Sequence, residues 1–157
     1  MTSIISIGAG KIVGVKTSIF TIFNPEKYDA KVIPTAWQEF FGEARGTEIA
    51  NTNVFYGVSI PSMAVDVPMD YYAGVIVDSH TEVPKGFESY EIPAGDYLAI
   101  IHRGPITELA ATYQSAYMHE LGQSGREMRP APHLEIYNSQ LDPMSAEYEM
   151  TIGIPVN

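Results

Sequence analysis

The chain has 157 residues, of which 45% are hydrophobic and 18% charged, a balance that indicates a single globular domain over 1–157 and excludes a disordered chain. Nine basic against nineteen acidic residues give a formal charge of −10, which argues against a surface for duplex nucleic acid and favours cationic ligands. Disulfides and thiolate metal sites are excluded because the sequence has no cysteine, and no apolar run reaches the roughly 20 residues that cross a bilayer. We therefore expect a cytoplasmic protein without signal peptide, membrane contact, metal or cofactor.

The first half of the chain predicts a strand, a helix and two further strands. The first strand is expected over 11–16, with a possible continuation to Phe23. The helix runs from about Pro34 to Arg45, with proline in its first turn and Gly46 just past its end. The next two strands, 53–59 and 70–77, are rich in aromatic and β-branched residues.

The second half predicts the same order of elements. A strand over 96–102 precedes a helix over 104–121, whose apolar residues recur at helical spacing. Strands over 133–137 and 147–154 complete this half. The chain therefore reads as a repeat.

The two repeats are β-α-β-β modules of about 10–78 and 90–156, joined by a linker of about 79–95 that carries prolines and glycines. Three strands and one helix are marginal for stability, so we expect the modules to pack together around a pseudo-twofold axis. The expected fold is an α+β domain of antiparallel sheets with the helices on one side. A ligand groove is expected between the modules.

The strand over 133–137 holds a carboxylate within an apolar and aromatic run. Alternation places Leu134 and Ile136 on one face, and His133, Glu135 and Tyr137 on the other. An ionised acid in a buried strand is costly unless a positive group pairs with it. Glu135 is thus expected either to meet a cationic ligand or to be a structural acid. In the second case its partner would be His133, a backbone donor or one of three arginines, Arg103, Arg126 and Arg129.

Aromatic residues are abundant, and aromatic faces attract cations by about 0.5–2 kcal/mol each. Superposing the halves aligns Tyr56 with Glu135 and Tyr72 with Glu149, so we expect both tyrosines, with Tyr137, to line the groove. Glu149 is either a second acid near the groove or a solvated residue at a sheet edge.

Three other aromatic residues could serve the core or the groove. Trp37 and Tyr113 both lie on expected helices, where each could belong to the core or line the groove. Strict alternation turns Tyr148 towards the helices, so a role in the groove would need a bulge or a cleft edge.

Several segments together resemble a known family, and they are 33–40 with its tryptophan, 83–97, 101–105, 134–137 and 152–156. In order and spacing they are similar to the GyrI-like small-molecule-binding domains. These domains are the effector-binding modules of AraC-type and MerR-type multidrug regulators, and they also occur as stand-alone proteins. The resemblance runs from about Lys11 to Val156.

The resemblance implies the duplicated fold, a central aromatic pocket and a glutamate that meets the charge of lipophilic cations. Glu135 falls at that glutamate. Because only about ten residues precede the first expected strand, we expect the stand-alone form, without a DNA-binding segment and without direct nucleic acid binding.

The expected function is the capture of amphipathic or lipophilic cationic aromatic molecules. Two alternatives remain. One is a hydrolase of strained electrophilic molecules with Glu135 as general base. The other is a protein-interaction modulator of the gyrase-inhibitor type, or an effector subunit for a separately encoded regulator.

Overall fold

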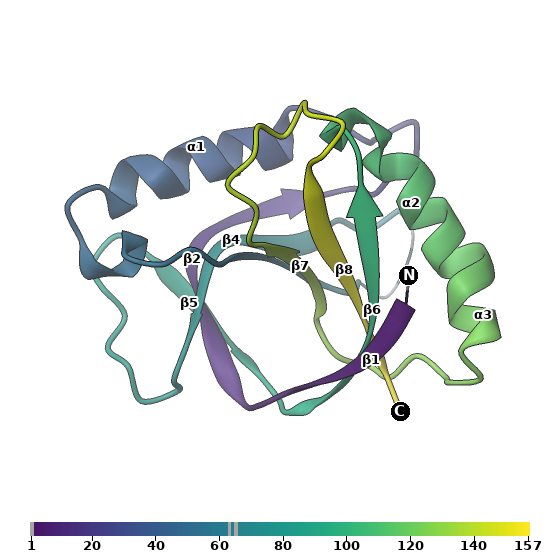
Figure 1. The fold of residues 1–157 in the computed structure, drawn as a ribbon. Helices are drawn as coiled ribbons and strands as arrows, with labels where there is room; N and C mark the ends of the chain where they lie inside the picture. Colours follow the sequence, from purple (N-terminus) through teal and green to yellow (C-terminus); the bar gives the residue numbers. More distant parts are fainter. Residues whose placement is uncertain (1, 63, 65) are drawn as a thin grey trace.

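The computed structural model describes residues 2–62, 64 and 66–157, and an antiparallel sheet of eight strands forms its centre (Figure 1). In chain order the strands are β1 (Thr2–Ile7), β2 (Gly10–Ile19), β3 (Phe55–Ile60), β4 (Met69–Val77), β5 (Glu88–Ile92), β6 (Gly95–Arg103), β7 (His133–Tyr137) and β8 (Glu149–Val156). Their spatial order is β1-β6-β8-β7-β3-β4-β2-β5.

This order confirms the predicted α+β fold and its duplication. The strands β6-β8-β7 mirror β2-β4-β3, and the two halves meet where β7 pairs with β3. The halves share one continuous sheet instead of two. Two edge strands lie outside the repeat, and β5 falls within the segment expected to be a linker. Pairing with β2, and not a buried face of its own, holds the mostly exposed β5 in place.

The first helix, α1 (Val32–Ala44), lies over β2 and β4 and is followed by the short 3₁₀ turn η1 (Glu48–Ala50). Ala36, Phe40 and Ala44 recur at four-residue spacing, so one stripe of α1 is fully buried against the sheet. Gly46 follows the helix with φ of 77°, a left-handed conformation that ends helices and favours glycine.

The second helical segment covers the other half of the sheet (Figure 1). It consists of η2 (Ile106–Glu108), α2 (Leu109–Ser115), the π-helical turn η3 (Ala116–Glu120) and α3 (Leu121–Gln123). The buried His102 ties it to β6, because its Nδ1 lies 2.7 Å from Thr112 Oγ1. No helix among the described residues has the length and apolarity needed to span a membrane.

Apolar residues pack on both faces of the sheet. On the helix side, one cluster lies under α1 and another under α2 and η3. On the other side, Ile12, Tyr72, Tyr97 and Leu134 belong to a third cluster. The middle of the helix side, where β7 meets β3, lies between the two helices and borders a large cavity.

Candidate ligand-binding cavity

The cavity has a volume of about 1320 Å³, larger than the roughly 300–1,000 Å³ typical of small-molecule sites. Its floor comes from β3, β4 and β7, and its walls come from α1 and α2. The loops around 20–30 and 139–143 contribute to its rim. Most of the lining residues are apolar or aromatic, so an occupant would gain chiefly from hydrophobic contact and stacking.

Glu135 lies at the floor of the cavity with 7% of its surface exposed. Tyrosine hydroxyls donate to both of its carboxylate oxygens. Oε1 accepts from Tyr71 at 2.9 Å and from Tyr137 at 2.7 Å, and Oε2 accepts from Tyr113. Tyr71, Tyr113 and Tyr137 thus form a tyrosine cage around the carboxylate. Burial, and then the negative charge of Glu135, raise the pKa of each cage hydroxyl, so all three remain donors at neutral pH.

No ion pair formed by the described residues includes Glu135. Arg103 pairs instead with Glu147 at 2.6 Å, and Arg126 with Asp96 at 3.3 Å. The third candidate arginine, at position 129, donates to the Val156 carbonyl at 3.1 Å. Pairing with an arginine is therefore wrong as an explanation of this buried acid, and its charge is met by neutral hydroxyls alone.

Trp37 supports the tyrosine cage from α1. Its Nε1 donates to the Tyr71 hydroxyl at 3.1 Å, and its ring meets Tyr137 edge-on at a centroid distance of 5.3 Å. Phe41 and Phe55 pack on the same indole. A hydrogen-bonded chain thus runs from the tryptophan through Tyr71 to Glu135, and an aromatic wall stands beside it.

Gly57 gives the carboxylate its room. It lies directly opposite Glu135 across the β3–β7 pair. A Cβ atom here would lie 2.5 Å from Glu135 Oε1 and closer still to the Tyr71 hydroxyl. A glycine inside a strand often marks such a close approach, and this was the available sequence signal.

Five of the expected site residues lie together around the cavity, namely Glu135, Tyr137, Trp37, Tyr113 and Tyr148. Tyr148 faces the helices, as alternation predicts, and it needs no bulge because the cavity lies on the helix side. Burial, and then the charge of Glu135, raise the pKa of Tyr148.

Two other expectations about position are wrong. Tyr56 and Tyr72 belong to the cluster on the opposite face, where Tyr72 packs against Tyr90 at 5.9 Å. Of the two alternatives for Glu149, the place near the groove is wrong and the solvated one is correct, because Glu149 is exposed and is paired with Arg103 in the sheet register. The superposition of the halves gave β3 the wrong face, because Tyr56 lies opposite Ile136 and it is Gly57 that lies opposite Glu135. A shift of one residue moves every side chain of a strand to the other face.

Sequence reasoning missed Tyr71, Gly57 and Tyr117. Tyr71 alternates with Tyr72, so the face of β4 that it shares with the buried Ala73 and Val75 also forms the cavity floor.

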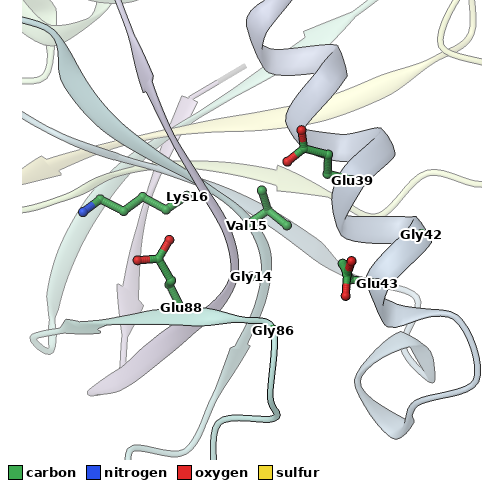
Figure 2. A pocket seen from close by; sticks show the side chains of 8 residues that line it. All are labelled: Gly14, Val15, Lys16, Glu39, Gly42, Glu43, Gly86 and Glu88. Atoms are coloured by element: carbon green, nitrogen blue, oxygen red, sulfur yellow. The ribbon is translucent and has the colours of Figure 1, made fainter.

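A second, smaller hollow of about 490 Å³ lies between α1, β2 and β5 (Figure 2). Figure 2 shows Glu39 and Glu43 on α1, and Glu88 on β5, at its border. These acids are exposed, and the described residues contain no cluster of three or more acidic or histidine side chains arranged to hold a metal ion. This hollow supports no assignment.

A duplicated sheet with two helical segments beside an aromatic cavity defines a small-molecule-binding domain. Residues 11–156 match the family of integron-associated effector binding proteins, Cass2, and the chain belongs to this family. The GyrI-like resemblance seen in the sequence is thereby confirmed.

Individual relatives extend the comparison. The transcriptional regulator BrlR of Pseudomonas aeruginosa is 27% identical over 124 residues, which are 76% of this chain and 44% of the regulator. The chain thus spans less than half the length of that relative. The structure of SAV2435 bound to tetraphenylphosphonium matches with a TM-score of 0.74 and 19% identity, over 100% of this chain and 94% of the other. The structure of the integron cassette protein of Vibrio cholerae matches with a TM-score of 0.67 and 14% identity. That match covers 99% of this chain and 95% of the other.

Proposed function

We propose that this protein binds lipophilic aromatic cations in the cavity, with Glu135 as the counter-charge. One observation carries the proposal. Glu135 is buried at the floor of a large aromatic cavity, and it has hydroxyl partners but no positive partner among the described residues. A buried charge without an opposite charge is costly, and a cation in the cavity would lower that cost.

The hydrogen bonds of the tyrosine cage favour a particular kind of cation. A carboxylate has about four acceptor positions, and three are occupied by hydroxyls. An ammonium group that must replace several water hydrogen bonds would find few acceptors here. A phosphonium or quaternary ammonium has no donors to satisfy, and it would also gain from the aromatic faces. The likeness to SAV2435, whose structure holds tetraphenylphosphonium, supports the same ligand class.

Calorimetry with tetraphenylphosphonium tests the proposal. With the cation roughly 6 Å from the carboxylate and an effective dielectric constant near 20, the charge interaction is about 3 kcal/mol, or about 100-fold in affinity. Glu135→Gln should therefore weaken binding by up to two orders of magnitude. Glu149→Gln removes the same charge from the opposite face and should change affinity less than about threefold. Equal losses in the two variants, or no loss in either, would contradict the proposal.

A further inference from the structure

The cavity contains a second polar group beside Glu135. His133 lies two residues earlier on β7 and faces the same side, so its Cα is roughly 7 Å from that of Glu135. Its Nδ1 lies 2.5 Å from the Tyr117 hydroxyl. Among the described residues, His133 Nε2 has no hydrogen-bond partner.

The two polar pairs are built in the same way. Tyr113 and Tyr117 are four residues apart on one helical segment, about 6 Å along its axis, which matches the spacing of alternate residues on β7. Tyr113 donates to Glu135, and Tyr117 meets His133. The rings of Tyr113 and Tyr117 are nearly parallel at 11°, and Tyr117 is stacked on His133 at 5.8 Å. The helical segment and β7 thus form two polar pairs at the cavity wall, Tyr113–Glu135 and Tyr117–His133.

The helix turn that carries Tyr117 in the second pair is not an ordinary α-helical turn. Tyr117 lies in the π-helical turn η3, and such turns are rare and frequent at functional sites. Phe23, from the rim loop after β2, packs edge-on against Tyr117 at 5.9 Å. The tyrosine is therefore held between the loop and the histidine.

The chemistry of the two groups determines where the protons of the Tyr117–His133 pair lie. A phenol is a good donor, and a neutral imidazole has one acceptor and one donor nitrogen. Burial lowers the pKa of His133 to about 4, so the ring is uncharged at neutral pH. With Tyr117 donating to Nδ1, the ring proton resides on Nε2. Nε2 then presents an N–H donor that has no acceptor among the residues that the structure describes.

We propose that Tyr117 and His133 form a neutral subsite in which His133 Nε2–H donates to an uncharged oxygen of the ligand, a carbonyl or an ether. The inference rests on the proposed function, because the ligand's positive centre faces Glu135 at the same time. The preferred ligand is therefore an aromatic cation with a hydrogen-bond acceptor roughly 7 Å from its positive centre, which is the spacing of alternate residues on a strand. Tyr117 is a positioning residue, since it sets the tautomer of the histidine.

Two matched probes test the subsite. (4-Acetylphenyl)triphenylphosphonium carries a carbonyl, and (4-isopropenylphenyl)triphenylphosphonium has nearly the same shape without an acceptor. One neutral hydrogen bond corresponds to about three- to tenfold in affinity, so the wild type should bind the acetyl probe that much more tightly. His133→Phe should abolish the preference. His133→Gln, whose amide N–H can take the place of Nε2–H, should restore part of it.

A spectroscopic readout separates a contact from a change in folding. In protein with ¹⁵N-labelled histidine, assigned by its loss in His133→Gln, the His133 shifts should indicate a proton on Nε2. That signal should move with the acetyl probe and stay in place with the isopropenyl probe. In Tyr117→Phe the tautomer should become mixed and the preference should fall.

Each outcome is informative. Equal affinity for the two probes, or a proton on Nδ1, would overturn the subsite and leave cation binding intact. Failure of both probes to bind would overturn the subsite together with the proposed function.

Discussion

Gly57→Ala is the most specific structural perturbation of this site. The new Cβ would lie 2.5 Å from Glu135 Oε1, whereas ordinary contacts of a Cβ atom begin at about 3.4 Å. It would lie closer still to the Tyr71 hydroxyl, so the carboxylate and this hydroxyl must both move by roughly an ångström, which breaks at least one hydrogen bond of the tyrosine cage.

The magnitude follows from two contributions. A hydrogen bond to a charged group is worth about 1.5–3 kcal/mol, and overpacking a buried site costs about 1–3 kcal/mol. Because relaxation relieves part of the overlap, we expect a net loss of roughly 2–4 kcal/mol in the free energy of unfolding. For a domain of this size the midpoint of thermal unfolding should fall by roughly 4–15 °C.

Gly42→Ala is the matched control, with an expected effect of opposite sign. Gly42 is exposed in α1, and an added Cβ would meet nothing within 4 Å. Replacing a helical glycine by alanine should stabilise the protein by up to about 1 kcal/mol. Urea titration and calorimetry with tetraphenylphosphonium measure both effects. Unchanged stability and unchanged affinity in Gly57→Ala would refute the close approach that we describe.

Three further predictions concern neighbouring groups. Tyr71→Phe should lower stability by about 1–3 kcal/mol and weaken cation binding in calorimetry, whereas Tyr72→Phe, on the other face, should leave affinity within about twofold. Burial lowers the pKa of His133 from 6.5 to about 4, so its contribution to stability is present above pH 6.5 and is lost as pH falls towards 4. The free energy of unfolding, measured by urea titration, should fall by roughly 3 kcal/mol over this pH range. An equally steep dependence of that free energy on pH in His133→Gln would count against the prediction. The raised pKa of the tyrosine cage predicts stability that is full below pH 10 and lost above it, less steeply in Tyr71→Phe.

Much of this molecule could be predicted from its sequence, because the signals were local. The strand over 133–137 has the bounds expected for it, and α1 begins two residues earlier and ends one residue earlier than expected. Glu135 stood out because a carboxylate is rare in an otherwise apolar strand. The repeat of elements indicated the duplication that the sheet order displays.

The remaining features depend on contacts between distant segments. Whether Tyr71 or Tyr72 faces the cavity depends on which side of the sheet the helices occupy and on the β3–β7 register. The sequence of a single strand predicts neither of these. The edge strand β5 buries little and is held by pairing with β2, so alternation gave no signal for it. Tyr117 meets His133 only after a helix and a strand have packed together.

The central claim is that the charge of Glu135 selects cations, and two tetraphenyl ions test it most directly. Tetraphenylphosphonium and tetraphenylborate have nearly the same shape and opposite charge, so their difference in affinity isolates the electrostatic part. We predict saturable calorimetric binding of the phosphonium and no measurable binding of the borate. In Glu135→Gln the affinities should converge, mainly through an up to 100-fold loss for the cation. Equal binding of the two ions by the wild-type protein, or a gap that persists unchanged in Glu135→Gln, would contradict the account.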